Sequence, residues 1–190
     1  GRPTSDGRGE GAESRPEPIV LIGFGPVGHH VGEILSRAGV HFVAVDPDAD
    51  LVSRERARGQ PVHYFDPTGR GLLDMLDARN TPAIVMTLDD TGENPALAQS
   101  LREQYPDVSI ITLVNDLESG RSLGRLGSID VVSTNVSASL ALARKALAKI
   151  GVSKKAANEA IGKYHRQCEA SLARAAPTPR KRFDAFRNRK

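Results

Sequence analysis

The stretch that decides the fold reads IVLIGFGPVG, at residues 19–28. Its first four residues are all apolar, which is typical of a strand buried on both faces. The glycines that follow, Gly23, Gly25 and Gly28, have the G-x-G-x-x-G spacing and lead into a helical pattern. A strand, a glycine turn and a helix in this order predict a site where backbone amides at the helix start bind a phosphate group.

The pattern continues along the chain as an alternation of strands and helices. The helix after the glycines has the apolar residues Val27, Val31, Ile34 and Leu35 and ends at Gly39. Further strands are predicted at 40–45, 62–65, 83–88, 108–114 and 129–132, and further helices at 51–58, 72–76, 95–104 and 117–126. Strands that are apolar on both faces and separated by helices pair in parallel with right-handed crossovers. The fold class is therefore α/β, a Rossmann-like doubly wound parallel six-stranded sheet of order 3-2-1-4-5-6.

Two amphipathic helices follow this sheet. The first is expected to be capped by Asn135 and to end at Gly151, and Ser153 can cap the second. Their apolar positions are Val136, Leu140, Ala143, Leu147 and Ile150, then Ala157, Ala160, Ile161, Tyr164, Cys168 and Leu172. Because a complete sheet leaves little for them to cover, we expect them to mediate dimerisation. The alternative is that both pack back onto the sheet of their own chain.

Composition divides the 190 residues, 20.4 kDa, into four segments. Residues 1–17 are rich in Gly, Pro, Ser and charge and are expected to be a disordered linker, because they cannot bury enough apolar surface. The nucleotide-binding domain covers 18–133 and the dimerisation helices 134–176. Residues 177–190 form a basic, disordered tail with six basic side chains and one acidic. Since the tail supplies the excess positive charge, a folded nucleic-acid-binding face is not expected.

Composition also excludes several classes of protein. The longest apolar runs have about five residues, whereas a membrane-spanning helix needs about 20. A single cysteine, Cys168, excludes an internal disulfide framework and a thiolate zinc cage and favours a reducing compartment. Tryptophan is absent and aromatic residues number eight, which disfavours a single-strand binder that stacks bases.

Acidic and hydroxyl side chains follow the predicted strands. Asp46 directly follows the second predicted strand, eighteen residues after Gly28, where a carboxylate accepts hydrogen bonds from ribose hydroxyls and repels a 2′-phosphate. The ligand it favours is NAD(H) or AMP, with an unphosphorylated 2′-ribose. Asp66 follows the third strand, and Thr87 and Asp89 follow the fourth, all at the edge where open α/β sheets bind ligands. The alternative is a Rossmann-like domain whose glycine turn has lost its ligand.

Catalytic machinery is not evident. None of the histidines has an obvious carboxylate partner in sequence; they are His29, His30, His41, His63 and His165. No histidine spacing typical of metal sites is present, and Cys168 lies on the apolar stripe of the last helix. A nucleotide site without groups that transform a substrate favours a sensor rather than an enzyme.

Five stretches in this order resemble a known family. They are IVLIGFGPVG (19–28), VDPDADLV (45–52), VHYFDPTGRGLLDML (62–76), TLDD (87–90) and IITLVND (110–116). Together they resemble the RCK or TrkA-N domain, and most closely the cytoplasmic C-terminal domain of Kef-type potassium/proton antiporters. The resemblance covers residues 18–175. It implies a homodimer through the trailing helices, NAD(H) or an adenine nucleotide in the cleft, and a place on the cytoplasmic side of the bacterial inner membrane, with this segment soluble.

The resemblance also implies roles for particular positions. The candidate cofactor-binding residues are Gly23, Phe24, Gly25, Pro26, Val27, Gly28, Asp46, Pro47, Asp66, Thr68, Thr87, Asp89 and Asn115. Two departures, Pro26 and Pro67, each remove a backbone donor near the ligand. Glutathione-gated members carry two arginines after the fifth strand, where this chain has Leu113 and Asn115. We therefore expect nucleotide sensing without glutathione gating of that kind.

Three functions stay open at this point. The preferred one is a regulatory domain, not an enzyme, that controls potassium transport, expected to be antiport against protons, in a membrane domain joined through residues 1–17. The second is a small NAD-dependent oxidoreductase or its coenzyme domain. The third is a separate peripheral subunit of a Trk-type potassium uptake system. The basic tail is either solvated or in weak contact with anionic lipid.

Overall fold

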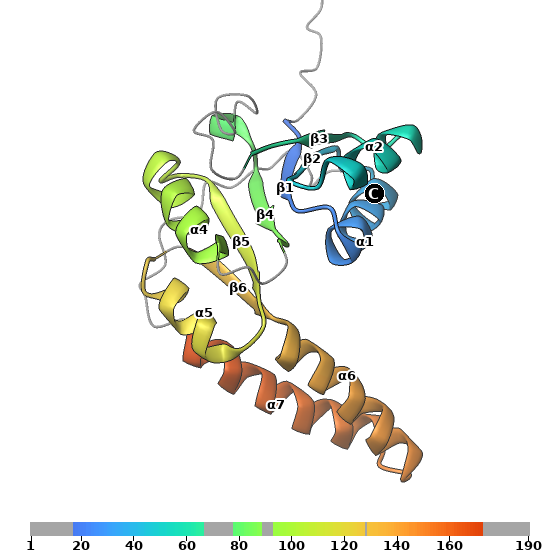
Figure 1. Cartoon of the computed structure of the whole chain (residues 1–190). Coiled ribbons are helices and arrows are strands. Elements are labelled where there is room, and N and C mark those ends of the chain that lie inside the picture. Colours follow the sequence, from blue (N-terminus) through green and yellow to red (C-terminus); the bar gives the residue numbers. More distant parts are fainter. Residues whose placement is uncertain (1–16, 67–77, 89–92, 128, 173–190) are drawn as a thin grey trace, which may run out of the picture.

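The fold is an open parallel sheet flanked by helices, followed by a projecting pair of helices (Figure 1). The computed structural model describes residues 17–66, 78–88, 93–127 and 129–172. Six strands form one sheet in the order β3-β2-β1-β4-β5-β6, and every neighbouring pair is parallel. The strands are β1 (Ile19–Ile22), β2 (Phe42–Asp46), β3 (Val62–Tyr64), β4 (Ala83–Met86), β5 (Ser109–Val114) and β6 (Ile129–Ser133). The predicted fold class and strand order are confirmed.

The helices also follow the predicted alternation. They are α1 (Pro26–Arg37), α2 (Ala49–Ala57), α4 (Glu93–Gln104), α5 (Leu117–Gly124), α6 (Thr134–Lys149) and α7 (Lys154–Leu172), with a 3-10 turn η1 (Ala78–Asn80) before β4. The helix predicted at 72–76 lies outside the described residues. No helix in the described ranges is long and apolar enough to span a bilayer.

The sheet has a separate hydrophobic core on each face. Leu21, Phe24 and Phe42 are buried on the face covered by α1 and α2. Ile22, Leu101 and Leu123 are buried on the other face, which α4 and α5 cover. A sheet covered on both faces explains why its strands read as continuous apolar runs.

Helix α1 packs on the sheet through glycines rather than through all of its apolar side chains. Gly28 and Gly32 are its buried residues; a Cβ at Gly32 would lie 2.8 Å from the Phe42 ring. Val27 and Ile34, two of the four apolar residues of the predicted helix, instead stay 41% and 66% exposed. The close approach on the glycine side turns these two side chains toward solvent.

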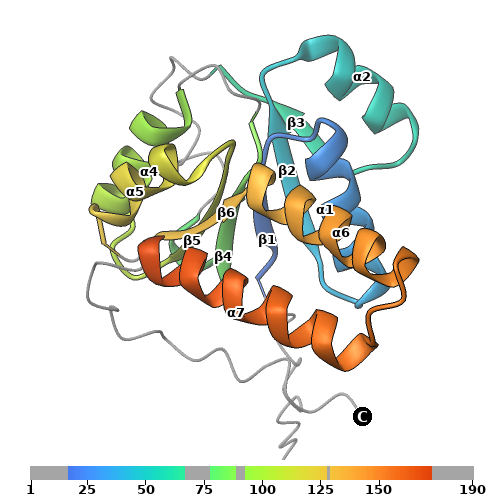
Figure 2. The same ribbon diagram turned by 90° about the horizontal axis from the view of Figure 1, so that it is seen from below.

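Helices α6 and α7 form an antiparallel pair, called the hairpin below (residues 134–172). The base of the hairpin packs against α5, one of the helices that cover the sheet. The contact is close, because a Cβ at Gly124 of α5 would meet the Leu172 carbonyl oxygen of α7. Figure 2 shows the rest of the hairpin extending past the sheet on the side of α1. In α6, which the structure describes throughout, no residue is buried. The hairpin thus packs back onto its own sheet only at its base.

The ends of the hairpin helices test the predicted caps. Ser133, not Asn135, caps α6, because the Ser133 Oγ accepts a hydrogen bond from the Val136 amide at 3.3 Å. The prediction of Asn135 was wrong because the helix begins one residue before it, at Thr134. The Ser153 cap is confirmed by a 3.2 Å hydrogen bond from the Ala156 amide. Gly151, with φ +84°, makes the turn between the helices.

Candidate functional site

The candidate site lies at the edge of the sheet where the parallel strands end. Gly23, Asp46 and Thr87 directly follow or end β1, β2 and β4, and Asn115 follows β5. Strands β1 and β4 are neighbours although β2 and β3 come between them in sequence. This is the point where the chain reverses direction across the sheet, and ligands of open α/β sheets bind there.

The glycine turn is pinned between three strands. Gly23 has φ +97°, a conformation that glycine adopts without strain. Its amide donates to the Val45 carbonyl at 2.8 Å, and its carbonyl accepts from the Thr87 hydroxyl at 2.9 Å. A Cβ at Gly28 would lie 2.1 Å from the Gly23 carbonyl oxygen, so α1 and the turn are in direct backbone contact. The Thr87 hydroxyl therefore stabilises the turn, because its proton is donated to the Gly23 carbonyl and not to a ligand.

Gly25 is different, because it faces open space. A Cβ built there has no atom within 4 Å, and its φ of −64° is ordinary for any residue. Gly25 is the N-cap of α1 and has no side-chain cap bond, and Pro26 occupies the first helical position. The next amides, of Val27 and Gly28, lie in the first turn of α1, where no carbonyl of the helix reaches them. A diphosphate can approach backbone donors at this point.

Asp46 faces the turn from β2 and is 6% exposed. One carboxylate oxygen accepts from the Phe24 amide at 2.7 Å and the other from the Asp48 amide at 2.8 Å. Each oxygen keeps a second lone pair, so both can also accept from the two hydroxyls of a ribose. Asp46 thus braces the glycine turn and is available to a sugar.

Other candidate residues differ in burial and in the hydrogen bonds they make. The Phe24 side chain is 2% exposed and stacks on Phe42, so only its backbone borders the turn. Pro47 is half-buried and Asp66 exposed. The Asn115 carbonyl accepts from the Ser133 hydroxyl and the Asn135 amide at 3.1 and 3.0 Å. Two more candidates, Thr68 and Asp89, lie outside the described residues.

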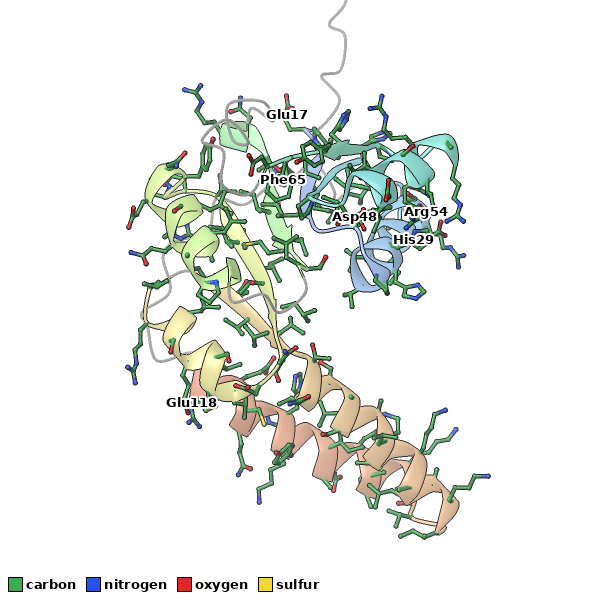
Figure 3. All side chains as sticks on the ribbon, in the orientation of Figure 1. Glu17, His29, Asp48, Arg54, Phe65 and Glu118 are labelled. Carbon is green, nitrogen blue, oxygen red and sulfur yellow. The ribbon has the colours of Figure 1, made fainter. Side chains whose placement is uncertain are left out.

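Sequence reasoning missed a histidine–carboxylate contact beside the site. His29 Nδ1 lies 3.4 Å from a carboxylate oxygen of Glu55, and the other oxygen accepts from Arg58 at 2.7 Å. The His29 ring also packs edge-on against Phe24 of the glycine turn. The pair joins α1 to α2, on the side of the molecule where Figure 3 labels His29, Asp48 and Arg54. No spacing signals it, because the partners are 26 residues apart on different helices.

A second such pair joins His165 and Glu169 on α7 at 3.7 Å. Both histidines thus have carboxylate neighbours that sequence reasoning did not find. Among the described residues, no three His, Cys, Asp or Glu side chains are close enough to hold a metal ion.

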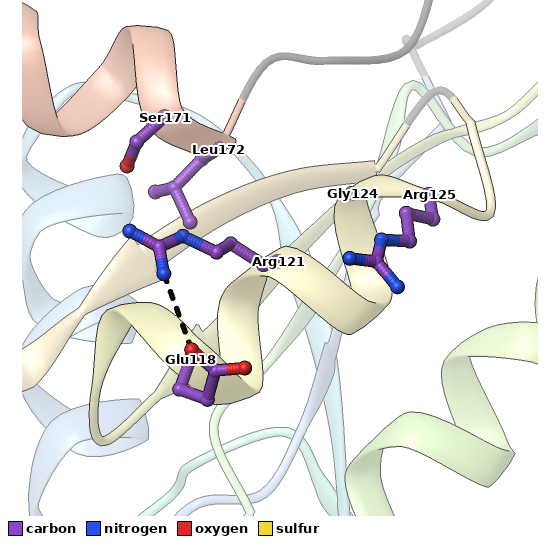
Figure 4. Close-up of a pocket in the computed structure, with 6 residues that line it drawn as sticks. All are labelled: Glu118, Arg121, Gly124, Arg125, Ser171 and Leu172. Carbon is purple, nitrogen blue, oxygen red and sulfur yellow. Dashed lines mark hydrogen bonds and ion pairs between the residues drawn. The ribbon is translucent and has the colours of Figure 1, made fainter.

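Several cavities of the described residues lie where α5 meets the hairpin, and two of them have charged walls. One, of about 390 Å³, is lined by Glu118, Arg121, Gly124, Arg125, Ser171 and Leu172, and Figure 4 shows Arg121 paired with Glu118 there. The other, of about 420 Å³, is lined by Asp116, Leu117, Glu118, Arg121, Ser133, Asn135, Val136, Ser139 and Tyr164. The backbone and hydroxyl of Ser119 donate hydrogen bonds that lower the pKa of Asp116, the N-cap of α5. The sequence could not reveal these cavities, because their walls come together only in the fold.

The fold and the glycine turn define a Rossmann-type domain. Residues 19–134 match the model of the TrkA-N domain, so the chain belongs to the TrkA-N domain family. It is 30% identical to "K(+) efflux antiporter 2, chloroplastic" of Arabidopsis thaliana over 131 residues, 69% of this chain and 11% of that one. It is 27% identical to the glutathione-regulated potassium-efflux protein KefC of Escherichia coli O139:H28 over 154 residues, 81% of this chain. The chain therefore spans 11% to 25% of these relatives.

Solved structures agree on the fold. The Shewanella denitrificans Kef CTD in its AMP-bound form has a TM-score of 0.71 at 22% identity, covering 82% of this chain and 95% of that one. The GsuK channel bound to NAD has a TM-score of 0.61 at 23% identity, covering 70% of this chain and 24% of that one. The resemblance to TrkA-N domains and Kef antiporters is confirmed.

Proposed function

We propose that this domain binds an adenine nucleotide or dinucleotide, AMP or NAD(H), and thereby regulates monovalent cation transport by an attached membrane domain. The observation that carries the proposal is the open space at Gly25, with the Asp46 carboxylate across the turn. Backbone donors suit the phosphate and the carboxylate suits the ribose. The AMP-bound and NAD-bound neighbours support this choice of ligand.

The transported ion is proposed from the relatives. One relative is a K(+) efflux antiporter and another is a potassium-efflux system protein, which supports potassium as the ion that the membrane domain transports. Protons are then the proposed exchange partner. The domain itself is then on the cytoplasmic side of the membrane. Its role is to sense rather than to catalyse, and ligand binding shifts transport only as far as the ligand prefers one arrangement of the domain over another.

The hairpin supports a homodimer as the unit that changes arrangement. Leu142 and Ile150 are 69% and 76% exposed, an unusual degree for large aliphatic side chains in a folded chain of this size. Their exposure, and the absence of buried residues in α6, support burial against a second copy.

The test of ligand binding is titration calorimetry and thermal shift of the whole chain with AMP, NAD, NADH and NADPH. We expect AMP or NAD(H) to bind and NADPH to bind at least tenfold more weakly. The Gly25→Ala variant should lose at least tenfold in affinity, because the new Cβ occupies the space that the phosphate needs. Its melting temperature without ligand should stay close to that of the unmodified chain, since the Cβ meets no protein atom.

Gly25→Ala is a sharper test than a change at Asp46. Asp46→Ala removes the ribose partner but also releases the Phe24 and Asp48 amides, so it alters the turn even without ligand. Failure of all four nucleotides to bind, or equal binding by the Gly25→Ala variant, would overturn the proposed site.

A further inference from the structure

Glu55 is a buried carboxylate to which the nucleotide site described above assigns no role. It lies on α2 and is 7% exposed. Its Oε1 atom accepts a hydrogen bond from Arg58 at 2.7 Å. Its Oε2 atom is buried and has no hydrogen-bond donor in the described part of the chain. An acceptor that is buried without a donor destabilises a fold, so a group that donates to Oε2 would stabilise this one.

The group placed to donate is the imidazole of His29 on α1. Its Nδ1 atom lies 3.4 Å from Glu55 Oε2, longer than a charge-assisted hydrogen bond of about 2.7–2.9 Å. A neutral imidazole carries one N–H and an imidazolium two, so protonation ensures a donor at Nδ1. Histidine is the side chain that ordinarily gains charge between pH 8 and pH 5, and the His29 side chain is 36% exposed to solvent. Protonation therefore lets this contact close into a charge-assisted hydrogen bond.

His29 also belongs to the structure that holds the glycine turn. Its ring packs edge-on against Phe24, with the ring centroids 5.6 Å apart. Its amide donates to the Gly25 carbonyl at 2.8 Å, and the Phe24 amide donates to Asp46. A hydrogen bond from His29 to Glu55 would thus fix the first turn of α1 against α2 and, through Phe24, the backbone amides proposed to meet the phosphate.

Other charged or titratable side chains lie on the elements around this pair, on the side where Figure 3 labels His29, Asp48 and Arg54. They are His30, Glu33 and Arg37 on α1, Asp46 on β2, and Asp48, Asp50, Arg54 and Arg56 on or next to α2. Strand β1 carries none. Glu33 is paired with Arg37, and Asp46 accepts from backbone amides. Of these residue types only histidine ordinarily changes charge between pH 8 and pH 6, so His30 is the matched control for His29.

We propose that His29 and Glu55 are positioning residues for the nucleotide: protonation of His29 completes the bond to Glu55, orders the glycine turn and tightens nucleotide binding. The proposal rests on the proposed function, because it concerns the affinity of the same site. Proton and nucleotide are then reciprocally linked, since each favours the ordered turn. A fall in pH from 8 to 6 raises the affinity for nucleotide, so the domain responds to pH as well as to nucleotide concentration.

Titration calorimetry of the whole chain with NAD at pH 8 and pH 6 tests this role. NAD is the probe because a phosphate monoester such as AMP itself takes up a proton near about pH 6, whereas the NAD diphosphate stays ionised. We expect binding at least about threefold tighter at pH 6. His29→Gln should bind NAD with the same affinity at both pH values, because glutamine does not titrate. His30→Gln removes the exposed histidine next to His29 and should keep the full pH dependence.

Glu55→Gln separates positioning from simple charge attraction. An imidazolium at residue 29 also attracts a diphosphate directly, and that attraction needs no carboxylate on α2. Glutamine keeps the shape of Glu55 and an oxygen that accepts from Arg58, but it has no charge to pair with His29. We therefore expect Glu55→Gln to lose the pH dependence as well. A pH dependence that persists in Glu55→Gln, or that His30→Gln abolishes, would overturn the positioning role.

Melting temperatures without nucleotide keep the two proposals apart. We expect Glu55→Gln to lower the melting temperature more at pH 6 than at pH 8, and in a His29→Gln background the two losses should be equal. Equal NAD affinity of the unmodified chain at both pH values would overturn the positioning role and leave the nucleotide site intact. Melting temperatures that show the coupling of His29 and Glu55 in a chain that binds no nucleotide would overturn the proposed function, and the positioning role with it.

Discussion

The sheet domain (residues 18–133) and the hairpin of this chain bury apolar surface to very different extents. The domain buries two hydrophobic clusters on the two faces of its sheet and has a net charge of −7 over residues 18–133. The hairpin has a net charge of +5, buries little beyond Ala157, Ile161 and Cys168, and leaves Leu142 and Ile150 in solvent. The sheet domain thus covers its apolar side chains within the chain, whereas the hairpin leaves large apolar side chains exposed.

The largest expected difference between the two regions is in the change of the free energy of unfolding when a helical glycine is replaced by alanine in each. Gly28→Ala should destabilise the domain by more than about 3 kcal/mol, because its Cβ would lie 2.1 Å from a backbone oxygen that cannot move away. Gly162→Ala in α7 should instead stabilise the chain by about 0.5–1 kcal/mol, the gain in helix propensity. Its Cβ meets only the flexible end of Arg166, at 3.2 Å.

Urea denaturation of both variants measures the contrast. If the two free energies of unfolding change by similar amounts, the close packing between α1 and the glycine turn is not present in solution. If Gly162→Ala destabilises the chain, the packing of α7 differs from that described above.

The contrast at Gly28 also shows what the sequence could predict. The strands, their order and the glycine turn were predictable, because continuous apolar runs and the G-x-G-x-x-G spacing are local signals. The positions of Val27 and Ile34 were not. Helical periodicity marks all apolar residues of α1 alike, whereas the buried side is set by how closely Gly28 and Gly32 approach the sheet.

For the candidate site, the location of the residues was predictable from the sequence, but their hydrogen bonds were not. Asp46 and Thr87 follow strands, and the parallel topology brings them to one edge. What each side chain does there required coordinates: the Thr87 hydroxyl is used by the Gly23 carbonyl, and Asp46 braces the turn. The His29–Glu55 pair was missed because it links two helices that only the tertiary fold places together.

A second prediction compares leucines of the two regions. Leu101 is fully buried in α4, so Leu101→Ala should cost about 2–5 kcal/mol at any protein concentration. Leu142→Ala should change the stability of a dilute monomer by less than about 0.5 kcal/mol. It should, however, lower the melting temperature at high protein concentration, where dimerisation contributes. Equal effects at all concentrations would show that the hairpin is covered within its own chain.

A third prediction concerns the cavity where the two regions meet. Its wall carries the carboxylates of Asp116 and Glu118 and one arginine, Arg121, which Glu118 already pairs. Glutathione is an anion at neutral pH, so we expect millimolar glutathione to leave the melting temperature unchanged.

Asn115→Arg, at the position directly before the cavity-lining Asp116, serves as the gain-of-binding control. One charge-assisted hydrogen bond contributes about 1.5–3 kcal/mol, so the variant should bind glutathione at least tenfold more tightly than the unmodified chain. Tight stoichiometric binding of glutathione by the unmodified chain in calorimetry would refute the expectation.

The smallest expected effect is a difference in pH dependence between the stability that one helix N-cap contributes in the sheet domain and the stability that another contributes in the hairpin. Asp116 caps α5 in the domain, and the hydrogen bonds from Ser119 lower its pKa in the folded chain. A carboxyl whose pKa is lower folded than unfolded stabilises the fold above its unfolded pKa, near 4, and loses that contribution as the pH falls through the folded value. Ser153 caps α7 in the hairpin without a titrating group. The stability lost on Asp116→Ala should therefore shrink between pH 7 and pH 3, while that lost on Ser153→Ala stays constant. Thermal melts of both variants and of the unmodified chain between pH 7 and pH 3 measure these losses of stability. A pH-independent loss for Asp116→Ala would mean that another group caps α5.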